Sequence, residues 1–135
     1  MTNRPNLYLH VGPGKTGTSA IQRWLGSQAD TLKAASYLYP VPEDLLLFEG
    51  NASVLGNILL RDAGDEDATR AEIKVIIDRL SHQVASESYA HLILSSEYLA
   101  GAQIKNLRLF KNIASSYFSI KIILVARHPY PWLWS

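Results

Sequence analysis

Short apolar runs alternate with longer amphipathic stretches along this chain. The runs over 7–11, 91–95 and 120–126 are typical of strands, and a shorter run over 36–39 ends at Pro40. Between these runs, apolar residues recur at intervals of three and four positions, which predicts helices. Such alternation is typical of βαβ units. We therefore expect an α/β fold, with a parallel sheet flanked by helices and right-handed crossovers.

Three helices are predicted from this periodicity. The first follows the strand at 7–11 and is expected to place Arg23 opposite its buried face. The second begins after an acidic turn at 64–67 and runs for about 20 residues, and the third precedes the strand at 120–126. Their faces are defined by Ile21, Trp24, Leu25 and Gln28; by Ile73, Ile76, Ile77, Leu80 and Val84; and by Ile104, Leu107, Phe110 and Ile113. The stretch 43–64 is expected to mix short helix and loop.

The run 120–126 has the strongest strand pattern. Most of its residues are β-branched and Lys121 is its one polar residue, so we expect a strand buried on both faces of the sheet. Parallel sheets bind ligands at the carboxyl ends of their strands. The segments that follow Val11, Ser95 and Ala126 are therefore where chemistry is expected.

Composition narrows the class of protein. The 135 residues suit one domain, and a hydrophobic content of 47% with 19% charged residues excludes disordered and fibrous classes. The net charge is +1, so no chain-wide basic field would attract nucleic acid or a membrane. There are no cysteines, which excludes disulfide frameworks, thiolate metal sites and cysteine nucleophiles.

Targeting segments are not apparent. The first residues are polar, and no apolar run approaches the roughly 18 residues of a membrane span. We therefore expect a cytoplasmic protein with no membrane segment.

The segment after the first predicted strand has the composition of a phosphate-binding loop. It reads Gly12-Pro13-Gly14-Lys15-Thr16-Gly17-Thr18-Ser19, and a helix is expected to begin inside it. Glycines let successive backbone N–H groups point inward, and a helix N-terminus and a lysine add positive charge. A plain turn between strand and helix is the structural alternative.

The position of the lysine distinguishes this loop from the usual nucleotide-triphosphate loop. Gly12 and Gly17 have the G-x-x-x-x-G spacing, but Thr18 stands where a lysine is expected, and Lys15 lies three positions earlier. This arrangement argues against an ordinary ATP or GTP hydrolase. It suits a ligand with a single 5′-phosphate that carries a transferred group.

The segment after the last predicted strand offers a second phosphate contact. Arg127 follows the strand directly, and Ser135 lies in the first turns of the helix expected there. A guanidinium can bind a phosphate with two parallel hydrogen bonds, and a serine hydroxyl can add a third. Taken alone, Arg127 would more often cap the sheet or pair with a carboxylate.

Together the two segments resemble the sulfotransferase family. The loop Lys15-Thr16-Gly17-Thr18-Ser19 is similar to that family's 5′-phosphosulfate loop, and Arg127 with Ser135 is similar to its 3′-phosphate motif. The stretch 37–40 also resembles a short strand that often follows the family's first helix. The resemblance implies 3′-phosphoadenosine 5′-phosphosulfate (PAPS) as sulfonate donor and a P-loop nucleotide-hydrolase-like architecture, with no metal.

The resemblance also implies roles for single residues. Lys15 would stabilise the leaving phosphate, while the segment Gly14 to Ser19 would hold the 5′-phosphate. Arg127 and Ser135 would hold the 3′-phosphate, although His128 stands where the family often has an acidic residue. Family members usually continue for another hundred or more residues. We therefore expect 1–135 to be the N-terminal portion of one sulfotransferase domain, truncated and of little activity alone.

Transfer to a hydroxyl needs a general base, and Glu97 is the candidate. It follows the strand at 91–95, where many carbohydrate sulfotransferases place a glutamate. The alternative is that Glu97 caps the following helix or pairs with Lys15 or Arg127. His10 and His128 are expected near the same edge, but no histidine is assigned a role and no pair has metal-site spacing.

Three function classes stay open at this point. The leading one is a PAPS-dependent sulfotransferase acting on a small-molecule, carbohydrate or lipid acceptor, with a sugar, peptide or lipid hydroxyl favoured over a phenol. The second is a P-loop small-molecule kinase. The third is a non-catalytic nucleotide-binding remnant. An uncovered sheet edge would also favour a homo-oligomer.

Overall fold

The central element of the molecule is a parallel sheet of four strands in the order β2-β3-β1-β4. The computed structural model of the chain describes residues 4–11, 18–40, 51–61 and 64–124. The strands are β1 (Asn6–Val11), β2 (Tyr37–Leu38), β3 (His91–Ser95) and β4 (Ser119–Leu124). All three strand pairings are parallel, which confirms the predicted α/β class.

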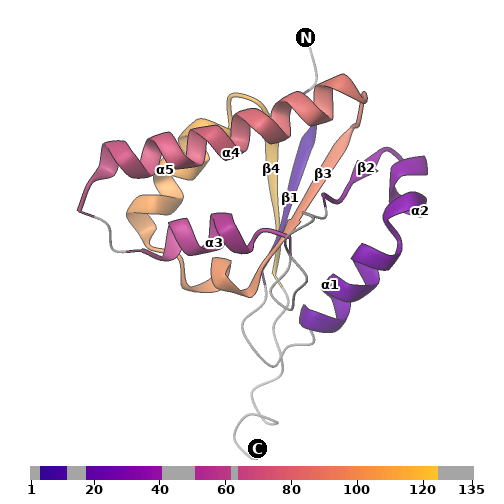
Figure 1. Cartoon of the computed structure of the whole chain (residues 1–135), viewed down its shortest axis with the longest axis horizontal. Coiled ribbons are helices and arrows are strands. Elements are labelled where there is room, and N and C mark those ends of the chain that lie inside the picture. Colours follow the sequence, from indigo (N-terminus) through magenta and orange to yellow (C-terminus); the bar gives the residue numbers. More distant parts are fainter. Residues whose placement is uncertain (1–3, 12–17, 41–50, 62–63, 125–135) are drawn as a thin grey trace, which may run out of the picture.

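Helices cover the two faces of the sheet, as Figure 1 shows. The shorter layer contains α1 (Thr18–Ser27) and α2 (Ala29–Ala34), which connect β1 to β2. The opposite layer contains α3 (Ser53–Leu60), α4 (Glu66–Ser86) and α5 (Ile104–Ala114), with the short 3₁₀ helix η1 (Glu97–Gly101) between β3 and α5. None of these described helices is long and apolar enough to cross a membrane.

The two layers bury cores of different size. The larger core fills the space between the sheet and α3, α4 and α5, and includes Leu7, Leu9, Leu92 and Leu94 from the strands. The smaller one lies between the sheet and the α1–α2 layer, and is built on Leu25, Tyr39 and Ile93.

Helix α4 matches its prediction closely. It has 21 residues, and the side chain of its N-cap, Asp65, accepts a hydrogen bond from the backbone N–H of Ala68 at 3.1 Å. This bond satisfies one of the helix's first N–H groups. Four of the five predicted apolar positions are buried, namely Ile73, Ile77, Leu80 and Val84, and Ile76 packs partly against the core.

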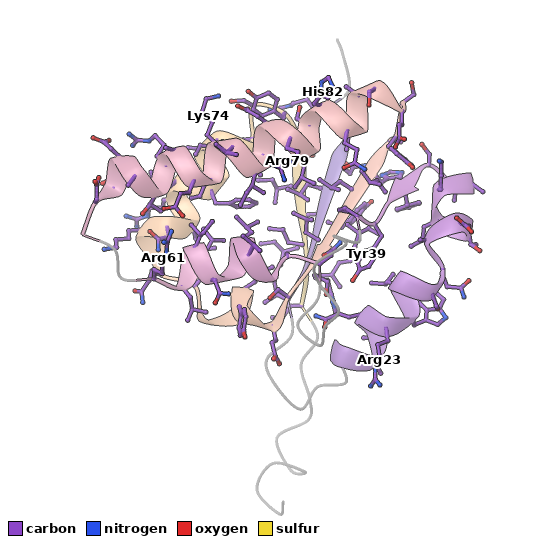
Figure 2. The ribbon with its side chains drawn as sticks, in the orientation of Figure 1. Arg23, Tyr39, Arg61, Lys74, Arg79 and His82 are labelled. Atoms are coloured by element: carbon purple, nitrogen blue, oxygen red, sulfur yellow. The ribbon has the colours of Figure 1, made fainter. Side chains whose placement is uncertain are left out.

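The buried face of α1 differs from the predicted one. Trp24 was predicted to be buried, but its side chain is 59% exposed, whereas Leu25 and Gln22 are buried. The helix is rotated toward Gln22 because the amide of this residue donates a hydrogen bond to the buried hydroxyl of Ser95, at 3.0 Å. Arg23 is exposed, as expected (Figure 2).

The buried face of helix α5 also differs from the predicted one, and it too contains a polar residue. Ile104 and Leu107 were predicted to be buried and are exposed, while Asn106 is buried. The Asn106 amide donates to the carbonyl oxygens of Leu59 and Arg61 at 2.9 and 2.8 Å, at the end of α3. Bonding these helix-end carbonyl groups holds the polar side chain inside the protein.

The prediction that the last strand is buried on both faces is wrong for the residues described. The segment from Lys121 to Leu124 is exposed, and the side chains of Ile122 and Leu124 are 69% and 67% exposed. The reason is the position of β4 in the strand order, where it pairs with β1 alone among the described strands. The region 43–64 contains α3, whereas 41–50 lies outside the described residues.

Candidate functional site at the carboxyl edge of the sheet

The carboxyl ends of β1, β3 and β4 lie side by side. In the sheet register His10 of β1 is opposite Ser95 of β3, and Val11 of β1 is opposite Leu124 of β4. The chain leaves β1 toward α1 on one face, and leaves β3 toward η1 and α5 on the other (Figure 1). Connections that diverge in this way open a crevice between two neighbouring parallel strands, which is where α/β sheets bind ligands.

Most of the predicted nucleotide-binding residues fall outside the described part of the chain. This holds for Gly14, Lys15, Thr16, Gly17, Arg127 and Ser135. Thr18 and Ser19 form the first turn of α1, but their side chains are not among those described. The elements on either side of the predicted 12–19 loop are present, since β1 ends at Val11 and α1 begins at Thr18.

Glu97 lies at the predicted edge, as the first residue of η1. The backbone N–H of the preceding residue, Ser96, donates to the carbonyl oxygen of His10 at 3.3 Å, which ties this segment to the end of β1. The N-cap of η1 is Ser96, whose hydroxyl accepts from the N–H of Tyr98 at 3.1 Å. Glu97 is therefore not the capping residue, which removes one of the two structural alternatives for it.

Asn51 holds the end of β3 in place. Its side chain accepts from the N–H of Ser95 at 2.7 Å and donates to the carbonyl oxygen of Ile93 at 3.0 Å. The next residue, Ala52, donates its N–H to the Ser95 carbonyl oxygen. Because β2 pairs only with the first two residues of β3, Asn51 and Ala52 take the place of a strand along the rest of that edge.

Helix α3 supports the Glu97 segment from outside. A Cβ atom at Gly56 would lie 2.8 Å from the Cβ of Tyr98 and 3.2 Å from the Ser96 hydroxyl oxygen. Only a residue without a side chain allows α3 to approach η1 this closely. Two different elements, α3 and β1, thus fix the backbone that carries Glu97.

A polar cluster that sequence reasoning missed lies at the same edge. The Nδ1 atom of His10 and the Nε2 atom of Gln22 lie 2.7 and 3.0 Å from the Ser95 hydroxyl oxygen, and all three side chains are buried. The signal in the sequence was a histidine in an otherwise apolar strand and a glutamine beside Ile21 on a helix. The sequence pattern predicts His10 near this edge without a role and does not distinguish Gln22 from a solvent-facing residue.

Glu97 is the acidic side chain described at this edge, and the histidine beside it is uncharged. Burial lowers the pKa of His10, so its imidazole is neutral at pH 7. No group of three or more histidine and acidic side chains that could hold a metal is found in the described ranges.

A hollow of about 340 Å³ lies on the opposite layer, between the starts of α4 and α5. Its lining includes Arg70, Lys105 and Arg108. Arg70 is paired with Glu66 and Asp67 through exposed ion pairs at 3.1 and 3.2 Å. This hollow lies across the sheet from the His10 cluster and contributes nothing to the candidate site.

The described residues define an α/β protein with a parallel sheet of four strands flanked by helices. Comparison with protein-family models, with curated proteins and with solved structures finds no match for this chain. Any assignment of function therefore depends on the chain's own residues and on the geometry described above.

Proposed function

We propose that the chain is the N-terminal portion of a PAPS-dependent sulfotransferase domain and binds the nucleotide between β1 and β3. One observation carries the proposal. The ends of β1, β3 and β4 are adjacent, so the three segments singled out in the sequence all continue from one edge of the sheet. The described ends of strands that lie far apart in the sequence thus meet at one edge, where α/β sheets bind ligands.

The surroundings of this edge are suited to an anionic ligand. Helix α1 begins at this end of the sheet, and it has no acidic residue in its first turn, unlike α4. Its first backbone N–H groups and the positive end of its dipole favour a phosphate there. The resemblance of the 12–19 loop to a 5′-phosphosulfate loop fits these flanking elements.

The proposed roles follow from the chemistry of sulfonate transfer. PAPS supplies a sulfonate group already joined to a phosphate leaving group. Lys15 would hold the 5′-phosphate and stabilise the negative charge left on it, while Arg127 and Ser135 would bind the 3′-phosphate. Glu97 would take the proton of the acceptor hydroxyl as its oxygen bonds to sulfur, and the sulfur–phosphate oxygen bond breaks on the opposite side.

The support for Glu97 as base is positional. It is partly exposed at the edge of the crevice and is carried on a backbone fixed by α3 and β1. A base needs such a fixed position and access to the acceptor. We therefore propose Glu97 as the catalytic base, with a sugar, peptide or lipid hydroxyl as the acceptor.

Calorimetric titration of adenosine 3′,5′-bisphosphate (PAP), the desulfonated product, tests the proposal. We expect PAP to bind and ATP with Mg²⁺ not to bind. Lys15→Ala and Arg127→Ala should each weaken PAP binding about tenfold to a hundredfold, because each removes a charge-assisted bond to a phosphate. Lys111→Ala and Arg79→Ala, on exposed positions of α5 and α4, are the matched controls and should leave binding unchanged.

Other outcomes of the titration would favour the kinase or the non-catalytic nucleotide-binding remnant. Binding of ATP with Mg²⁺ in place of PAP would overturn the proposal in favour of a kinase. Tight PAP binding with no sulfonate transfer from labelled PAPS to any of a panel of hydroxyl acceptors would favour a non-catalytic nucleotide-binding remnant. Where transfer occurs, Glu97→Gln should abolish it and leave PAP affinity unchanged.

A further inference from the structure

The cluster of His10, Gln22 and Ser95 joins three elements at the candidate site. The side chains come from β1, α1 and β3, and their exposed fractions are 4%, 7% and 0%. Ser95 is the central member, since its hydroxyl oxygen contacts both of the others. Buried polar groups are normally fully hydrogen-bonded, so each proton in this cluster can be accounted for.

The hydrogen bonds of Ser95 favour one tautomer of His10. The Gln22 amide nitrogen can only donate, so Ser95 accepts from it and has one proton of its own to donate. His10 Nδ1, at 2.7 Å, is the acceptor that the described residues offer to that proton. With the Gln22 nitrogen facing Ser95, we assign Nδ1 as the acceptor of the Ser95 proton, so the neutral ring carries its own proton on Nε2.

The surroundings keep this imidazole uncharged. Burial lowers its pKa, and β1, β3, β4 and α1 have no Asp or Glu that would favour the charged form. The helix η1, which also packs against β1, carries Glu97, but the pKa of His10 is lowered by burial all the same. His10 is thus a neutral hydrogen-bond donor. A neutral donor of this kind would bind a ligand oxygen through hydrogen-bond geometry, whereas Lys15 would bind it through its positive charge.

The Nε2 atom of His10 is the one polar atom of this cluster found without a hydrogen-bond partner. It is buried and has no hydrogen-bond partner, and it is the single side-chain nitrogen or oxygen atom so found among the described residues. An unpaired buried N–H is unfavourable and calls for an explanation. His10 lies two residues before Gly12 and pairs with Ser95 at the carboxyl ends of β1 and β3, so an acceptor oxygen of a ligand bound at this edge would provide one.

We propose that His10 Nε2–H donates a hydrogen bond to an oxygen of the 5′-phosphate end of the bound nucleotide. The inference rests on the proposed function, because that function supplies the ligand and places its 5′ end beside the 12–19 segment. Ser95 and Gln22 are positioning residues in this arrangement. They hold the imidazole in the tautomer that presents a donor, and they touch no ligand themselves.

Two substitutions at His10 separate the donor from the rest of the ring. His10→Gln keeps an N–H near the position of Nε2, whereas His10→Asn keeps a polar group near Nδ1 and has no donor at the farther position. We expect His10→Gln to bind PAP within about threefold of the unaltered chain and His10→Asn to lose at least about tenfold. Circular dichroism and urea unfolding check that both variants fold.

Adenosine 3′-monophosphate, which lacks the 5′-phosphate, shows which end of the nucleotide is contacted. The difference between His10→Gln and His10→Asn should disappear with this ligand. A difference of equal size with both ligands would overturn the inference, since it would show that His10 acts on the nucleotide as a whole.

Ring-nitrogen spectra of ¹⁵N-histidine-labelled chain test the same point without any substitution. We expect the His10 resonances of the Nε2–H tautomer, with a shift of the Nε2 signal on addition of PAP and little shift with adenosine 3′-monophosphate. This measurement decides the matter if the variants fail to fold. An unmoved Nε2 signal at saturating PAP would overturn the inference.

The two proposals fail in different ways. If PAP binds and binding depends on Lys15, but the Nε2 signal does not move and His10→Asn binds normally, then His10 is structural and the proposed function stands. If PAP does not bind the unaltered chain at all, the proposed function fails and the role of His10 fails with it.

Discussion

Strands β3 and β4 flank the same central strand and have opposite environments. Leu9 of β1 is opposite Leu94 of β3 on one side and Ile122 of β4 on the other. The three side chains share one face of the sheet, yet Leu94 is 2% exposed and Ile122 is 69% exposed. By sequence β4 is the stronger candidate for a buried strand. Burial of a strand is therefore decided by its neighbours in the sheet and by what covers it, and much less by its own composition.

The largest effect should come from truncating Leu94, the buried one of the two side chains that flank Leu9. Leu94→Ala should cost about 2–5 kcal/mol in the free energy of unfolding, because it leaves a cavity in the larger core. Ile122→Ala should cost less than about 1 kcal/mol, since the side chain is already solvated. Urea unfolding of both variants measures the difference. Equal losses would show that β4 is covered in solution and that the two strands do not differ.

A second, smaller effect should come from Asn51, which hydrogen-bonds the part of β3 that β2 does not pair with. Asn51→Ala should destabilise the protein by about 1–3 kcal/mol, because the Ser95 N–H and the Ile93 carbonyl oxygen both lose their partner. Asn57→Ala, on the exposed side of α3, is the matched control and should change little. Urea unfolding gives both values. A neutral Asn51→Ala would mean that the end of β3 needs no such support.

The smallest effect should be the pH dependence caused by His10, which contacts β3 through Ser95. Because burial lowers its pKa in the folded state, the unfolded chain binds the extra proton first as the pH falls below about 6.5. Stability from this group is therefore complete above that pH. It is lost as the pH falls toward the lowered pKa, with a slope of at most about 1.4 kcal/mol per pH unit.

Unfolding in urea at pH 7.5 and pH 5.5 measures this slope. His10→Gln should flatten it, while His82→Gln, at an exposed position on the outer helix α4, should not (Figure 2). An unchanged slope in His10→Gln would contradict a buried neutral imidazole.

The alternation of strands and helices could be predicted from the sequence, and so could the ends of α4, because these depend on local patterns and on the Asp65 cap. The faces of α1 and α5 could not. Each helix buries an amide side chain, Gln22 or Asn106, that bonds to a group far away in the sequence. A polar residue held by such a bond looks like a solvent-facing residue in any periodic pattern.

In the candidate site too, local features could be predicted from the sequence and contacts between distant residues could not. The sequence placed Glu97 at the carboxyl end of β3, because the end of a strand is a local feature. The contacts of Ser95 with His10 and Gln22 could not be predicted, since they follow from the sheet order and from the packing of α1. The roles of Lys15, Arg127 and Ser135 stay predictions, as these residues lie outside the described part of the chain.

The strand order also has a consequence for synthesis on the ribosome. Strand β1 is made first, yet its two neighbours in the sheet, β3 and β4, begin at His91 and Ser119. At about 5–20 residues per second, β1 emerges several seconds before either partner exists. An apolar strand with both edges unpaired is a binding site for chaperones and for other nascent chains during that time. Among the described strands, β1 thus waits longest for a partner while the chain is synthesised.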